Sequence, residues 1–240
     1  DLSNPSDDTT NNQNECAVVS RSSTGGTFYN IILENVELRI TRGSAALFSA
    51  NSYNNHFENI SIKDSIIKST TSSGGYVGSL LGTGTNTYIK NVQALNLQME
   101  NMGNYSGGLA GFLQSNYTNP SLIENSFVEL DLIINPLGCS RTSFGGILGY
   151  GYLGTVIKNS HTDGHIRQTS PNNCASNSSA RSTSLGGIYG YSRHCLLLNS
   201  YSSLNINKGD DGNPTPGAAE SDNCAGASGI GVASNVHRAA

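Results

Sequence analysis

The stretch YSGGLAGFLQSNYTNPSLIENSFVELDLI, residues 105–133, joins a glycine-rich half to a half that ends in alternating apolar and polar residues. The same pattern returns in FGGILGYGYLGTVIKNSHTDGHI, residues 144–166, where a double glycine again leads to an Asn-Ser step and an alternating run. Internal repetition at this length is typical of folds built from stacked repeats. These two stretches therefore guide the interpretation of the whole chain.

Both halves of the unit recur along most of the sequence. Double glycines begin at residues 74, 107, 145 and 186, and degenerate glycine halves begin at Ser44 and Ser228. The second half recurs around an asparagine, at Asn35, Asn59, Asn91, Asn125, Asn159 and Asn199. The chain is therefore expected to repeat one structural unit about six times.

Each unit favours β-strands over helix. Gly and Asn interrupt the chain every ten or so residues, and no apolar stripe with helical spacing is sustained. Val128, Leu130 and Leu132 alternate with Glu129 and Asp131, as in a strand with one buried face. A strand this short buries that face only when the next repeat stacks on it. The sequence predicts an all-β fold, a parallel β-solenoid (β-helix) of about six irregular coils with long outer loops.

Two residue types have expected places in such a coil. Asparagine tolerates the left-handed conformation at a bend, and its amide can bond to the equivalent asparagine one coil away. The six asparagines above are the predicted ladder. Glycine permits either a positive φ or a close approach of backbones at a corner. The predicted corner glycines are Gly75, Gly108, Gly146 and Gly187.

The repeats divide the chain into four segments. These are a polar N-terminal segment 1–23, solenoid repeats 24–206, a Gly/Pro/Asn-rich loop 207–226 and a partial terminal coil 227–240.

Composition narrows the classes of partner. Only 12% of the 240 residues are charged, and the net charge is −4. The 13 Lys and Arg residues are spread singly, so no basic surface is expected and nucleic acid is not an expected partner. No apolar run approaches the roughly 20 residues of a membrane span. No cofactor is expected.

The cysteines and sequons point to a secreted protein. The five cysteines lack CxxC spacing, so no zinc site or other metal site is predicted. We expect disulfides between Cys139 and Cys174 and, next in preference, between Cys195 and Cys224. The odd count leaves one thiol free or paired between chains. The N-glycosylation candidates are Asn59, Asn104, Asn116 and Asn177.

The phrase Gly-Gly-hydrophobic-any-Gly, followed by a hydrophobic-Asn-Ser step, resembles the GLUG repeat. The copies GGLAG, GGILG and GGIYG carry the resemblance most clearly, and AALFS departs from it. GLUG repeats occur in large adhesin-like surface proteins and in non-catalytic parts of secreted peptidases. The resemblance implies a non-enzymatic extracellular or cell-surface protein that acts as a stalk, a spacer or a display surface.

Parallel β-helices also include pectin-lyase-type enzymes, so a carbohydrate-active enzyme and a sugar-binding module are the alternatives. The segment NSHTDGHIR places His161, Asp163, His165 and Arg167 on one strand face, where the aligned repeats have ordinary solvent-facing polar residues. His161 and His165 are too far apart along a strand to share a metal ion. Asp64, Asp131 and Asp163 come from different coils at similar positions, and two of them in one groove would form an acid pair worth testing.

The two ends of the repeat array look complementary. The C-terminal CAGASGIGVASNVHRAA reads as a glycine half without its Asn half, and TFYNIILENVELRI reads as an Asn half with a weak glycine half. This predicts a head-to-tail contact that propagates as a filament, near Tyr29, Ile31, Ile230 and Val232. The alternative is a stack that continues into neighbouring domains of a longer chain.

Overall fold

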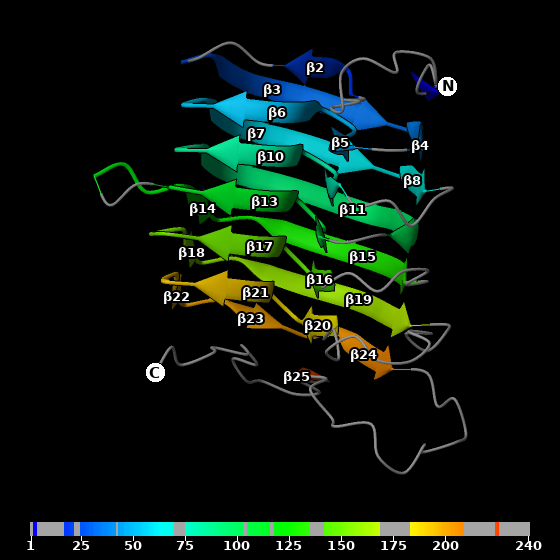
Figure 1. Ribbon diagram of the computed structural model, residues 1–240. Helices are drawn as coiled ribbons and strands as arrows, with labels where there is room; N and C mark the ends of the chain where they lie inside the picture. The colour runs from blue at the N-terminus through cyan, green and yellow to red at the C-terminus, as the bar shows by residue number, and fades with distance from the viewer. Residues whose placement is uncertain are drawn as a thin grey trace.

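The described residues coil into a stack of parallel strands in which successive turns follow the order of the chain (Figure 1). In the computed structural model each complete turn passes through a first, a second and a third sheet before the next turn begins. The described residues are 2–3, 17–21, 25–41, 43–69, 75–102, 105–115, 118–134, 142–168, 183–208 and 224–225.

The first sheet is the widest, and most turns contribute two strands to it. Its strands are β1 (Leu2–Ser3), β3 (Thr27–Glu34), β4 (Glu37–Ile40), β7 (His56–Lys63), β8 (Ile66–Ser69), β11 (Tyr88–Met102), β14 (Leu122–Glu124), β15 (Phe127–Ile134), β18 (Val156–Lys158), β19 (His161–Gln168), β22 (Leu196–Leu198), β23 (Tyr201–Ser202) and β24 (Asn205–Lys208).

The second and third sheets have six strands each. The second sheet holds β5 (Ala45–Ala46), β9 (Tyr76–Gly78), β12 (Tyr105–Gly107), β16 (Thr142–Gly145), β20 (Thr183–Gly186) and β25 (Cys224–Ala225). The third sheet holds β2 (Val19–Arg21), β6 (Ser49–Tyr53), β10 (Leu81–Thr85), β13 (Ala110–Gln114), β17 (Leu148–Tyr152) and β21 (Tyr189–Arg193).

All described strand pairs in the three sheets are parallel, as in β7 with β11, β9 with β12, and β10 with β13. The predicted all-β parallel β-solenoid is therefore confirmed. The first and last turns are incomplete within the described residues, so the stack holds fewer complete turns than the six coils predicted. The pairings of β1 with β4, β2 with β6, and β25 with β20 extend the sheets beyond residues 24–206 at both ends.

The core lies inside the coil and is built from columns of like side chains. Phe57, Ile89, Ile123 and Ile157 stand directly above one another in the register, and all four are fully buried. In β15 the apolar residues Val128, Leu130 and Leu132 point inward, while Glu129 between them is exposed. The period-two alternation of the sequence thus becomes an inside and an outside.

A column of asparagines bends each turn within the first sheet. Its members have positive φ between 45° and 56° and are Asn30, Asn59, Asn91, Asn125, Asn159 and Asn199. Side-chain amides of Asn59, Asn91 and Asn159 donate to Asn30, Asn59 and Asn125 at 3.1 to 3.3 Å. Asparagine is favoured at this position because it tolerates the left-handed backbone conformation. The hydrogen bonds of its side-chain amide join neighbouring coils.

Asn35 is not part of this column, and its predicted place belongs to Asn30. The aromatic ring of Phe28 stacks on that of Phe57 at 5.1 Å, and this buried contact sets Asn30 opposite Asn59. Asn35 has a positive φ of its own, at a second bend five residues further on.

The serine after the asparagine also has a structural role. The Val92 backbone N–H donates to the Ser126 hydroxyl at 3.3 Å, and Ser126 N–H donates to the Ser160 hydroxyl at 3.1 Å. Ser160 N–H in turn donates to the Ser200 hydroxyl at 3.1 Å. At the bend these buried hydroxyls accept bonds that a carbonyl accepts elsewhere in a sheet, which satisfies buried N–H groups.

The glycines allow close approach at the corner between the second and third sheets. Gly107 faces Gly78 and Gly145 in register, and Gly186 continues the column. A Cβ on Gly107 would lie 2.5 Å from Gly149 N and 2.7 Å from Ile147 O. Close backbone approach, and not a positive φ, is therefore what this corner requires.

Gly75 is not the equivalent of Gly108, Gly146 and Gly187. Because Gly78 pairs with Gly107, the residue at the position of Gly108 is Ser79. The Ser79 hydroxyl donates to the Gly108 carbonyl, so a polar side chain fits there by bonding to the next coil. The sequence alignment of the double glycines was shifted by four residues in this turn.

Candidate binding groove

The groove begins where a second column of turning residues stops. Asn35, Asp64 and Asn96 each have a positive φ, and the Asn96 amide donates to Asp64 Oδ1 at 2.7 Å. Between β11 and β15 the register shifts, so that Leu95 and Asn96 face only Glu129. The Asn96 backbone N–H donates to Glu129 Oε2 at 3.4 Å. The outer surface is hollowed from this point towards the C-terminal coils.

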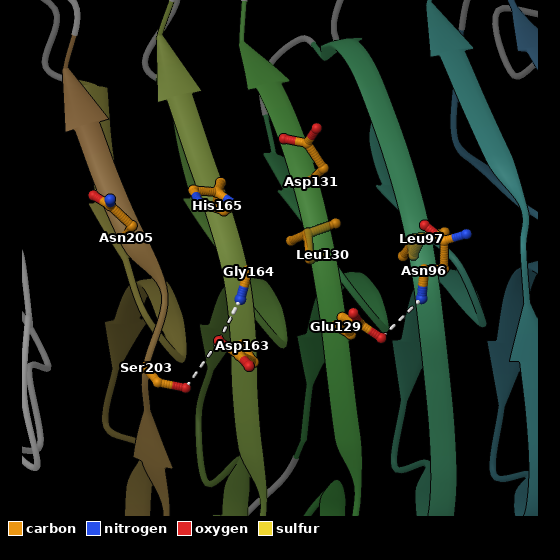
Figure 2. A pocket seen from close by; sticks show the side chains of 10 residues that line it. All are labelled: Asn96, Leu97, Glu129, Leu130, Asp131, Asp163, Gly164, His165, Ser203 and Asn205. Atoms are coloured by element: carbon orange, nitrogen blue, oxygen red, sulfur yellow. Dashed lines mark hydrogen bonds between the residues drawn. The ribbon is translucent and has the colours of Figure 1, made fainter.

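The groove crosses β11, β15, β19 and the β23–β24 segment and has a volume of about 360 Å³ (Figure 2). Leu97 and Leu130 lie beneath it, and their side chains, each 1% exposed, belong to the core. Its lining residues are Asn96, Leu97, Glu129, Leu130, Asp131, Asp163, Gly164, His165, Ser203 and Asn205.

Carboxylates from adjacent coils face each other across the groove. Glu129 pairs in register with Asp163, and Asp131 pairs with His165. Like charges directly opposite on neighbouring strands are destabilising. Asp163 Oδ1 accepts from the Gly164 N–H at 2.8 Å and from the Ser203 hydroxyl at 3.1 Å, which partly offsets this repulsion.

Gly164 is required by the backbone beneath the groove. Its φ is +110°, and a Cβ there would lie 2.9 Å from the Leu130 carbonyl carbon. The conformation and the space both exclude a side chain. The absence of that side chain keeps the groove open between Asp163 and His165.

Arg167 neutralises one of the acids. Its Nη2 donates to Asp131 Oδ1 at 2.9 Å and to Oδ2 at 2.7 Å. Both side chains are 40% exposed or more, so the pair contributes at most about 1 kcal/mol to stability. The pair holds the Asp131 carboxylate in one orientation at the groove wall.

An aromatic stack borders the groove at the N-terminal ends of β15, β19 and β23. The His161 ring stacks on Phe127 at 4.3 Å and on Tyr201 at 4.9 Å. Burial lowers the pKa of His161 from its ordinary 6.5, although the nearby Asp163 carboxylate opposes this shift. His161 is therefore a neutral stacking ring at neutral pH.

The groove offers hydrogen-bond acceptors, a few donors and an aromatic border, but no cluster of metal ligands. Among the residues that the structure describes, no group of three or more His, Cys, Asp or Glu side chains could hold a metal ion. The enzyme alternative required two of the three aspartates Asp64, Asp131 and Asp163 to lie in one groove. Asp131 and Asp163 do so, whereas Asp64 lies at the bend with Asn96. This donor set suits a hydroxyl-rich ligand such as a sugar.

The sequence reasoning found Asp131, Asp163 and His165 but missed most of the groove. A usable signal was present: the residue five after each ladder asparagine is Asn35, Asp64 and Asn96 in the first turns. In later turns it becomes Leu130, Gly164 and Leu204. The loss of the turning residue marks where the groove opens.

The described cysteines do not form the second expected disulfide. Cys195 is a free, half-buried thiol, and burial raises its pKa to about 11. Cys224 lies in β25, which pairs with β20 at Leu185. Because the Cys195 thiol is free, the expected Cys195–Cys224 disulfide is not formed. Cys139 and Cys174 lie outside the described residues.

Of the four sequons only Asn59 is described. Its amide nitrogen donates to Asn30 Oδ1, and its Oδ1 accepts from Asn91. A glycan on that nitrogen would remove a donor from the ladder. Asn104, Asn116 and Asn177 lie outside the described residues.

Of the four assembly candidates, Tyr29 is 64% exposed on β3, while Ile31 packs against the core. Ile230 and Val232 lie outside the described residues. No helix in the described part of the chain has the length and apolar character to cross a bilayer. Comparison with protein-family models, curated proteins and solved structures gives no significant match to this chain.

Proposed function

We infer that this chain is a non-enzymatic structural or adhesive β-solenoid that is secreted and acts outside the cell or at its surface, as a filament subunit or a stalk. The observation that supports this most is the continuity of the stack. The same side-chain columns and parallel backbone pairings run from β3 to β24, so each coil is joined to the next along three sheets. The resemblance to GLUG repeats supports a surface role.

Two measurements test this proposal. We expect antibody to label intact cells that make the protein, and we expect no new reducing ends or unsaturated products when the chain is incubated with a panel of polysaccharides. Label that appears only after permeabilisation would rule out the extracellular location. Products that disappear in a Glu129→Gln/Asp163→Asn double variant would establish a carbohydrate-active enzyme instead.

A second function, sugar binding, is favoured by the groove itself. Glu129, Asp163, Ser203 and Asn205 present polar groups around the groove, and the Phe127–His161–Tyr201 stack borders them. Small-molecule sites usually combine apolar or aromatic surface with a few convergent polar groups. An adhesive solenoid with this groove would hold a polysaccharide across four coils.

A glycan array compares the wild type with the Glu129→Gln/Asp163→Asn variant, and Glu37→Gln on β4 is the matched control. Glu37 is likewise a carboxylate on the first sheet but does not line the groove. We expect the double variant to lose binding at least tenfold and the control to retain it. Equal binding by all three proteins would exclude the groove as the site.

A further inference from the structure

In the first sheet, one column of outward-facing side chains is charged in its interior and uncharged at its two ends. In the interior it alternates in charge through Glu58, Lys90, Glu124 and Lys158. Ion pairs join Glu58 to Lys90 at 3.3 Å and Glu124 to Lys158 at 2.6 Å. The column ends on Tyr29 in β3 and on Leu198 in β22, which are 64% and 42% exposed.

A second outward column ends in the same way. It passes through Ser61, Gln93, Phe127 and His161, and its terminal residues are Ile32 and Tyr201. Ile32 is 66% exposed and Tyr201 is 50% exposed. Large apolar side chains thus stand at both ends of columns whose interiors are mostly polar.

The backbone at both ends is also open. Within the described part of the chain β3 pairs only with β7, and β22 pairs only with β18. Exposed strand edges are normally protected by charges or proline because they recruit other chains. β3 carries a charge only at Glu34 and β22 carries none, so neither edge is protected in this way.

The last described strand and the first strands of the stack lie at matching points of the turn. The last described turn has β22–β24 in the first sheet and β25 in the second, but its third-sheet position after β21 is empty of described strands. The N-terminal end presents the third-sheet strand β2, which precedes β3, and the first-sheet strand β1, which pairs with the outer edge of β4. A following copy would place β2 after β21, β3 after β22 and β5 after β25. Its β1 would have to leave β4, because in this register Leu2 takes the position of Ile206 in β24 of the preceding copy.

We propose that a second copy of this chain binds to the C-terminal end of the stack through β2, β3 and β5, in the register that continues the columns. Tyr29 of the following copy would lie on Leu198, and Ile32 would lie on Tyr201. Asn30 would lie beside Asn199 and extend the asparagine ladder. The contact continues the interface that already joins every pair of coils, and because it is head-to-tail it does not close.

This inference rests on the proposed structural function and names its partner and register. Six turns per subunit, counted along the second or the third sheet, at about 4.8 Å each give an axial repeat of roughly 29 Å. Light scattering and sedimentation over a concentration series should show association of the full chain, and electron microscopy should show filaments with that repeat. A wild-type chain that stays monomeric at every concentration would overturn the inference.

Charge variants test the register directly. Leu198→Glu and Tyr29→Lys each place a charge against an apolar partner residue, and we expect each single variant to weaken association at least tenfold. The double variant sets the introduced carboxylate against the introduced amine across the contact and restores the Glu–Lys alternation of the column. It should regain most of the association.

Gln93→Lys is the matched control, because it adds a lysine in the middle of a column that ends at Ile32. It should associate as the wild type does. Association of the single variants at wild-type strength, or no recovery in the double variant, would show that another surface or another segment occupies the edge. Such a result would exclude the head-to-tail contact but remain consistent with the proposed function as a stalk. Cleavage of a polysaccharide would instead exclude the proposed non-enzymatic function.

Discussion

The substitution Gly107→Ala tests the claim that the corner needs close backbone approach. The new Cβ would lie against Ala110 O, 2.5 Å from Gly149 N and 2.7 Å from Ile147 O, where ordinary contact begins at 3.4 Å. All three atoms belong to backbone, so the coils must separate by nearly 1 Å. This separation would break the bonds that Leu109 and Ala110 donate to Ile147 O at 2.9 and 3.1 Å.

The expected cost combines two effects. Overpacking costs about 1–3 kcal/mol, and each lost backbone bond costs about 1 kcal/mol. Gly107→Ala should therefore lower the free energy of unfolding by about 3–5 kcal/mol, measured by urea denaturation with circular dichroism.

Two further variants separate crowding from backbone conformation. Gly25 has a φ of +81° and a Cβ added there would meet no other atom within 4 Å, so Gly25→Ala should cost only about 1–2 kcal/mol for the left-handed conformation. Gly108→Ser should cost about as much as Gly107→Ala, because a Cβ there would press against Gly146 O and lie 2.5 Å from Val128 Cγ1. If Gly107→Ala cost no more than Gly25→Ala, the close-approach explanation would be wrong.

Three other predictions concern single side chains. The hydrogen bond from Lys158 to the buried Glu124 carboxylate lowers the pKa of Glu124 below its ordinary 4.5, so its stabilising effect is present above that pH and lost as the pH falls through the folded pKa. The difference in unfolding free energy between wild type and Glu124→Gln should accordingly shrink in acid, and a pH-independent difference would contradict this. Asn91→Ala should be less stable than Asn91→Gly in urea unfolding, because alanine adds about 1–2 kcal/mol for a φ of 52° while both lose the bond to Asn59. Cys195, with its pKa raised to about 11, should react with iodoacetamide at neutral to mildly alkaline pH roughly 100-fold more slowly than in the unfolded chain; equal rates would show an accessible thiolate.

Some structural features could be predicted from the sequence because they depend on local conformation. Asn59, Asn91, Asn125, Asn159 and Asn199 all have the left-handed backbone that an asparagine at a bend between strands suggested. The groove was harder to predict from the sequence. Glu129 and Asp163 are 34 residues apart in sequence and become neighbours only through the pairing of β15 with β19.

The sequence by itself determined the fold class of this protein. Strand periodicity, the turning asparagines and the glycine corners are local properties, and their repetition leaves few architectures other than a parallel solenoid. Only the tertiary structure decided the register. A shift of one residue moves every side chain to the opposite face, and loops of unequal length make such shifts invisible in an alignment. The buried stack of Phe28 on Phe57 and the pairing of Gly78 with Gly107 decide which coils meet at which residues. The groove and the matching ends follow from that register, since both are made of residues brought together only by packing.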